Sequence, residues 1–136
     1  MKSKSFKKEY IAILSGSLES QKGTINAPIA RKEGSIIERC VCNSGDVSIS
    51  HYEVLKHVED NTLVRFILET GRTHQLRVHS KHLGHPILGD TLYGKESNLI
   101  ARQALHSYKA SFIHPISKTQ ITHTAEIPED ISAILT

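Results

Sequence analysis

The 136-residue sequence contains no apolar run near the length of about 18 residues that a membrane-spanning helix requires. Its basic first ten residues, MKSKSFKKEY, lack the apolar segment of a secretory signal peptide. Cys40 and Cys42 are the only cysteines, and a disulfide between them would be strained because one residue separates them on an extended segment. We interpret both as reduced thiols. These absences predict a cytoplasmic protein that does not bind membranes.

Internal repeats, linkers and low-complexity tracts are also absent, and the length suits one domain. Hydrophobic residues make up 38% and charged residues 23% of the chain, which is typical of a globular protein. The net charge of +3 favours a polyanionic partner but is too small to identify one. We expect residues 1–8 to form a flexible segment and residues 9–136 to form the domain.

Short runs of alternating apolar residues, separated by Asp, Asn and Gly, predict an antiparallel sheet. The predicted strands cover residues 9–16, 38–42, 47–58, 62–69, 102–113 and 121–127. Residues 23–34 contain several turn residues and a proline, so they are predicted to be an irregular excursion.

The apolar period becomes helical after residue 72. Four residues share one face of a helix: Leu76, His79, Ser80 and Leu83. We predict a helix over 73–83, with Thr73 as a candidate N-cap and with Gly84 and Pro86 as its stop signal. A short terminal helix is predicted over 129–135, where acids lie near its positive end. The fold class is therefore α+β, a mainly antiparallel sheet with few helices.

The stretch 68–94, LETGRTHQLRVHSKHLGHPILGDTLYG, concentrates basic residues and glycines. A helix start presents free N–H groups and a partial positive charge, so Arg72 and His74 beside it suit a phosphate. Arg77 is one turn into the helix, so its side chain is expected near the helix start, and the turn after the helix is expected to return Asp90 and Tyr93 toward the same region. The basic residues of the stretch are Arg72, His74, Arg77, His79, Lys81, His82 and His85.

Each of these features also has a simpler interpretation. Arg72 and Lys81 are equally consistent with solvated surface charges, and Tyr10 with half-buried packing. The spacing of three between histidines 79, 82 and 85 offers a metal site as a rival hypothesis. The last of them lies beyond the helix stop, however, and no Cys or Glu completes a familiar ligand spacing, so we predict no metal.

The stretch TGRTHQLRVHSKHLGHPILGDTLYG closely resembles the C-terminal signature of the RluA-type pseudouridine synthases. The segments KKEYIAILSG, GTINAPIARK, SISHYEVLK and RQALHSYKASFIHPISK match the style of the same family in order, so the resemblance covers essentially the whole chain. It implies an isomerase that converts uridine to pseudouridine in ribosomal or transfer RNA without a cofactor or metal. The target nucleotide must leave its base stack to be reached.

The resemblance also implies roles for individual residues. Arg77 matches the arginine that pairs with the family's catalytic aspartate, and Tyr10 matches the tyrosine that stacks on the target base. Leu105 matches an apolar wall of the pocket. His106 is expected to be a hydrogen-bonded or RNA-facing group. The residues expected to meet RNA are Arg72, His74 and Lys81.

The family's aspartate motif, HRLD followed by TSG, does not occur in this sequence. In the family that motif precedes the strand that matches 9–16, so we expect this chain to be the C-terminal part of a catalytic domain. Such a part is predicted to be inactive alone. It either pairs with the missing N-terminal half or is a non-catalytic RNA-binding remnant.

Two structural expectations follow from the missing motif. Arg77 should be exposed, or should hold an anion or another acid, because an unpaired buried guanidinium is costly. The strands at 9–16 and 62–69 are the expected exposed sheet edges, which favours association into a two-fold dimer.

Overall fold

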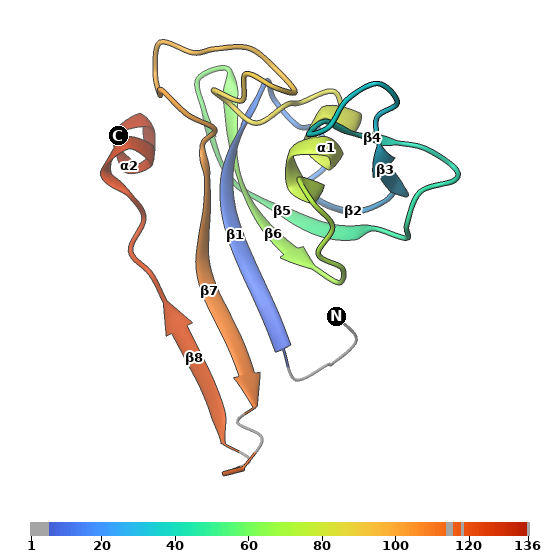
Figure 1. Ribbon diagram of the computed structural model, residues 1–136. Coiled ribbons are helices and arrows are strands. Elements are labelled where there is room, and N and C mark those ends of the chain that lie inside the picture. Colours follow the sequence, from blue (N-terminus) through green and yellow to red (C-terminus); the bar gives the residue numbers. More distant parts are fainter. Residues whose placement is uncertain (1–5, 114–115, 118, 136) are drawn as a thin grey trace.

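The computed structural model describes residues 6–113, 116–117 and 119–135 (Figure 1). Within this part, six strands form one antiparallel sheet in the order β2-β5-β6-β1-β7-β8. These strands are β1 (Phe6–Ser15), β2 (Lys22–Asn26), β5 (Ile49–Val58), β6 (Asn61–Leu68), β7 (Leu105–Ile113) and β8 (Gln120–Thr124). The short strands β3 (Ile29–Arg31) and β4 (Arg39–Val41) pair with each other. The helices are α1 (Gln75–His82) and α2 (Glu129–Leu135), and the predicted α+β class is confirmed.

β1 lies in the interior of the sheet rather than at its edge. It pairs with β6 on one side and with β7 on the other, and β6 in turn pairs with β5. The prediction that 9–16 and 62–69 form exposed edges is therefore wrong, because a strand from the C-terminal third of the sequence covers β1. The edge strands of the described sheet are β2 and β8.

Two further expectations about local structure need correction. Residues 6–8, which were expected to lie before the first strand, belong to β1, while residues 1–5 lie outside the described residues. The excursion predicted over 23–34 contains most of β2 and all of β3. Pairing with β5 and β4, which lie later in the sequence, makes these residues extended despite the proline between them.

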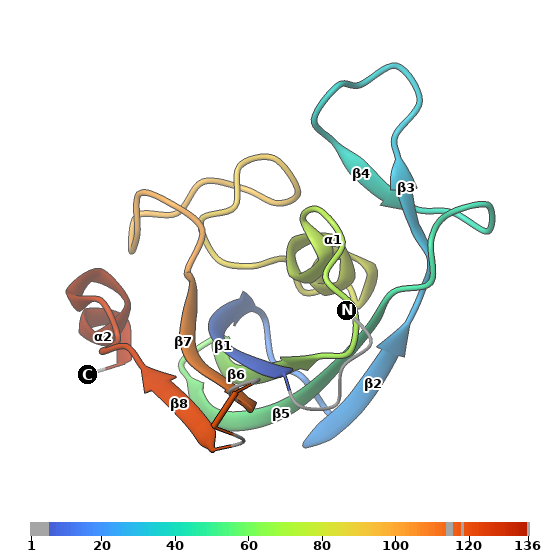
Figure 2. The ribbon, with the colours of Figure 1, turned by 60° about the horizontal axis from the view of Figure 1, so that its bottom comes forward.

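The sheet is strongly curved, and α1 lies inside its curve (Figure 2). The largest fully buried side chains include Ile13, Leu14 and Phe66 from the two central strands. Ile131 of α2 is also fully buried in the same core. Neither helix of the described part has the length and apolar character needed to cross a membrane.

The start of α1 differs in detail from the prediction. His74, not Thr73, is the N-cap residue, and its backbone is left-handed with φ of 57°. No side chain caps the helix in the usual way. The predicted stop is confirmed, since Gly84 follows the helix with φ of 87°, a conformation that favours glycine.

Candidate functional site

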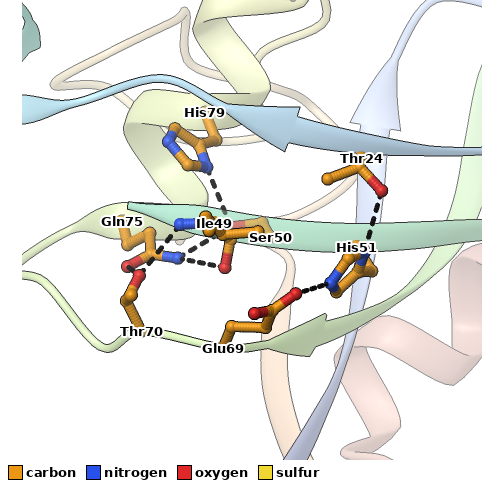
Figure 3. Close-up of polar contacts among 8 residues, drawn as sticks. All are labelled: Thr24, Ile49, Ser50, His51, Glu69, Thr70, Gln75 and His79. Atoms are coloured by element: carbon orange, nitrogen blue, oxygen red, sulfur yellow. Dashed lines mark hydrogen bonds and ion pairs between the residues drawn. The ribbon is translucent and has the colours of Figure 1, made fainter. Parts of the chain in front are cut away.

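Gln75, the first residue of α1, ties the helix to the end of β6 and the start of β5. Its side-chain oxygen accepts hydrogen bonds from the Thr70 hydroxyl at 2.7 Å and from the Arg72 backbone N–H at 2.9 Å. Its amide nitrogen donates to the Ile49 carbonyl at 3.1 Å and to Ser50 Oγ at 2.9 Å (Figure 3). The position of the Arg72 loop is therefore set by a buried glutamine.

His79, one turn further along α1, is fully buried and anchors the same face of the helix. Its Nε2 lies 2.9 Å from the Ala27 carbonyl and must donate to it, so Nδ1 accepts from the Ser50 hydroxyl at 2.8 Å. Burial lowers the pKa of His79 below its ordinary value, which keeps the ring neutral.

The metal hypothesis fails on the same geometry. Both ring nitrogens of His79 are committed to hydrogen bonds, and Nδ1 of His85 bonds the Ser15 carbonyl at 2.9 Å instead. Among the residues that the structure describes, no three His, Cys, Asp or Glu side chains gather as metal ligands.

Arg77 projects toward the turn that follows α1 and meets Asp90 there. Nε and Nη2 of Arg77 donate to the two carboxylate oxygens at 2.9 Å each, and the guanidinium lies 5.2 Å from the ring centre of Tyr93. Asp90 is fully buried and also accepts from the backbone N–H groups of Leu92 and Tyr93. The predicted return of Asp90 and Tyr93, and the prediction that Arg77 holds another acid, are confirmed.

These contacts keep Asp90 ionised despite its burial. Burial alone would raise the pKa of Asp90, but the hydrogen bonds from Arg77 and from the Tyr93 and Leu92 backbone hold this pKa below its usual range. The hydrogen bonds that Arg77 donates to Asp90 likewise raise the pKa of Arg77. The pair is thus a fixed ion pair in which neither carboxylate oxygen is free for chemistry.

His74 belongs to the same cluster. Its Nδ1 lies 2.7 Å from the Tyr93 hydroxyl, which also accepts the Arg39 backbone N–H at 2.8 Å. Burial and the charges of Arg77 and Arg39 lower the pKa of His74. A neutral, hydrogen-bonded imidazole stabilises this corner more readily than it binds an anion.

Arg72 and Lys81 are both exposed. Arg72 Nε donates to the Val47 carbonyl at 2.8 Å, which fixes the stem of the side chain, and its terminal nitrogens have no protein partner among the described residues. Lys81 makes no side-chain hydrogen bond or ion pair within the same part of the chain. Both cations are available to an anionic ligand.

Tyr10 and Leu105 share the sheet face that carries α1. Tyr10 lies opposite Phe66 on β6 and Ser107 on β7, whereas Leu105 lies opposite Ala12. Ser50, which contacts α1, is on this same face, because Tyr52 two residues later is opposite Phe66. Both predicted pocket residues are half-buried there.

Two polar networks escaped the sequence analysis, and both lie on the opposite face of the sheet. Nδ1 of His51 is 2.8 Å from the Thr24 hydroxyl, and its Nε2 contacts the Glu69 carboxylate (Figure 3). Thr24 and His51 are directly opposite on neighbouring strands, so the contact is a cross-strand pair. Only the strand register, which local sequence does not reveal, brings these side chains together.

The second network surrounds Glu9, which is 6% exposed. Its carboxylate accepts from the Tyr108 hydroxyl at 3.0 Å and from Arg65 Nη1 at 3.4 Å, while Arg65 Nη2 donates to Glu53 at 2.7 Å. Burial raises the pKa of Tyr108, so this hydroxyl remains a donor. The network stabilises the side of β1 that faces away from Tyr10.

The fold places the chain among the RNA pseudouridine synthases. The solved structure of Human RNA Pseudouridylate Synthase Domain Containing 1 matches 96% of this chain and 59% of its own, with a TM-score of 0.80 and 26% sequence identity. The family model described as RNA pseudouridylate synthase matches residues 1–82. The chain therefore belongs to the RNA pseudouridylate synthase family.

Curated relatives agree with this assignment. The Bacillus subtilis protein named RNA pseudouridine synthase YjbO is 46% identical over 129 residues, which are 95% of this chain and 46% of that protein. Ribosomal large subunit pseudouridine synthase D of Nitrosomonas europaea is 35% identical over 144 residues, covering 99% of this chain and 42% of that protein. The chain spans less than half the length of these relatives.

Proposed function

We propose that this chain is the C-terminal part of the catalytic domain of an enzyme that isomerises uridine to pseudouridine in RNA, ribosomal or transfer. The observation that supports it best is the joint placement of Tyr10, Leu105 and α1 on one sheet face. Family membership and the names of the relatives agree with this activity.

In this proposal, Tyr10 stacks on the flipped uracil and Leu105 forms an apolar wall beside it. Arg77 faces the family's catalytic aspartate. Its Nε and Nη2 already donate to Asp90, which limits the donors that remain for that aspartate. Arg72 and Lys81 contact phosphates, with His74 holding the helix start in place. Reduced Cys40 and Cys42 are the basis for proposing a cytoplasmic location.

The acids of the described residues do not supply a nucleophile in this proposal. Asp90 is buried and its two oxygens are occupied, and Asp130 is bound by Arg102. Asp46, which forms a backbone bridge with Ile29, and Asp60, in the turn between β5 and β6, are both exposed. The aspartate is expected to come from a segment equivalent to the N-terminal half of the relatives.

Activity assays on the chain alone and with that half test the proposal. The N-terminal half of the Bacillus subtilis relative would be supplied as a separate polypeptide, and pseudouridine in ribosomal and transfer RNA transcripts measured by mass spectrometry. We expect no product from the chain alone and product from the mixture, lost on Tyr10→Ala. Turnover by the chain alone contradicts the proposed dependence on a second half.

The alternative is a non-catalytic RNA-binding remnant. It is favoured by the locked Asp90 carboxylate, since no other described acid replaces the missing group. An assembled mixture that binds RNA without forming pseudouridine would support this alternative.

A further inference from the structure

A pocket lies between α1 and the β3–β4 hairpin, beside the cluster of Arg77 and Tyr93. Its floor is apolar, because Val78 of α1 packs with Ile29, Val41 and Tyr93. The lining residues are Lys32, Glu38, Arg39, Cys40, Val41, Val78, Lys81 and His82. We call this pocket the hairpin groove.

The rim of the hairpin groove carries an excess of positive charge. Lys32, Arg39 and Lys81 line it against one acid, Glu38, so the lysine, arginine and glutamate side chains leave a net charge of +2. Glu38 is already bound by Lys32 at 3.1 Å. Arg39 therefore has no carboxylate partner among the described residues, and its Nη1 makes only long contacts, 3.3 Å and 3.5 Å, to loop carbonyls.

The hairpin brings a second arginine beside the first. Arg31 lies directly opposite Arg39 in the β3–β4 pair, so both side chains leave the same face of the hairpin. That face carries Ile29 and Val41, which pack toward α1. Like charges placed directly opposite each other destabilise a strand pair, so an anionic ligand between them would relieve a cost that the free protein carries.

The helix completes the groove from its other side. Val78, Lys81 and His82 are three and four residues apart and so project from one side of α1. Neither Lys81 nor His82 has a side-chain partner among the described residues. The Arg39 guanidinium and the Lys81 ammonium group thus line an open groove with an apolar floor, and Arg31 lies beside Arg39 on the same face of the hairpin.

We propose that the hairpin groove binds phosphate groups of the RNA strand whose nucleotide enters the Tyr10 site. This inference rests on the proposed function and extends it to Arg31, Lys32 and Arg39. The Arg39 guanidinium presents paired donors that match the geometry of phosphodiester oxygens, and the Lys81 ammonium group adds a second positive charge. The Tyr93 hydroxyl links the groove to the α1 start, since it bonds both Arg39 N–H and His74.

Binding of a short single-stranded RNA to the full chain tests the proposal. Lys81→Gln keeps side-chain length and helical propensity while removing one charge. We expect it to weaken RNA binding roughly two- to five-fold, the range of one exposed charge contact. It should also lower the slope of log affinity against log salt by about 0.7. Lys22→Gln, on the sheet face away from α1, is the matched control and should change neither quantity.

Arg31→Gln gives a readout that a purely structural role would not produce. Removing the like-charge pair should raise the free energy of unfolding, whereas RNA binding should weaken as for Lys81→Gln. Amide resonances of the hairpin groove should shift on titration with the RNA, and more weakly with inorganic phosphate.

Three results would contradict the proposal that the hairpin groove binds RNA. The first is that the resonance shifts induced by RNA are confined to other surfaces. The second is that neither Lys81→Gln nor Arg31→Gln changes the affinity for RNA. The third is that an oligoglutamate peptide binds as tightly as RNA, which would show that the hairpin groove is a general cationic patch. The proposed function is tested separately. If the groove binds RNA but the assembled halves form no pseudouridine, the proposed isomerase activity is contradicted, whereas the proposed RNA binding by the groove is not.

Discussion

At the scale of single residues, the Arg77–Asp90 pair decides how this site is built. The guanidinium fork meets a fully buried carboxylate, and a Tyr93 ring lies beside it. A second pair, Arg102–Asp130, has the same two-bond geometry at 3.0 Å, but both of its side chains are more than two-fifths exposed. The two ion pairs therefore have the same geometry and differ in burial, so the effect of burial can be measured within one protein.

We expect Asp90→Asn to lower the free energy of unfolding by about 3 kcal/mol, because it leaves Arg77 without its counter-charge. The matched Asp130→Asn should cost less than about 1 kcal/mol. Urea unfolding at pH 7 measures both. Equal effects of the two substitutions would show that burial does not set the strength of this pair.

The difference between wild type and Asp90→Asn should also depend on pH. The folded-state pKa of Asp90 is lowered, so its contribution is fully present above the unfolded value of about 3.9. It is lost as the pH falls from there through the folded-state pKa. Unfolding curves at pH 7, 5 and 3 should therefore show the two proteins converging only at the lowest pH.

At the scale of elements, the attachment of α1 to the sheet positions the candidate site. An eight-residue helix has little stability of its own, so tertiary contacts must hold it. Gln75 supplies four hydrogen bonds between the helix start, β5 and the Arg72 loop. Thr73, the expected cap, supplies no cap hydrogen bond.

Gln75→Ala should lower the free energy of unfolding by about 2–4 kcal/mol, because it leaves buried polar partners unsatisfied. Thr73→Ala, the matched change two residues earlier, should alter it by less than about 0.5 kcal/mol. Thermal and urea unfolding give both values. If Thr73→Ala lowers the free energy of unfolding by more than this, Thr73 does cap the helix, as the sequence suggested.

At the scale of the whole molecule, the sheet ends at β2 and β8 within the described part. Exposed edge strands recruit further strands, either from a second copy or from a partner chain. β1 and β6, which the sequence suggested as edges, are unavailable because each already has two neighbours.

We expect the isolated chain to form a two-fold dimer at micromolar concentration through one of these edges, as light scattering would show. Asn26→Lys, a charge placed on the exposed side of β2, should shift the equilibrium toward monomer if β2 is the interface. Adding the N-terminal half of a relative should compete with this dimer. A monomer at all accessible concentrations would contradict the expectation.

Features that depend on neighbouring residues could be predicted from the amino-acid sequence. Alternation over 62–69 specified β6, and Gly84 after a helical period specified the end of α1. The turn residues after α1 also predicted the return of Asp90 toward the start of the helix. Periodicity and turn chemistry are local properties, so a single sequence carries them.

Which strands are neighbours could not be predicted from the sequence and became known only from the folded structure. Strand β7, which begins only at Leu105, pairs with β1 and makes it central. The Arg31–Arg39 pair and the Thr24–His51 pair likewise depend on register between separate strands. Register is set by the packing of whole faces against one another, and alternation within one strand is compatible with many neighbours, so local pattern cannot choose among them.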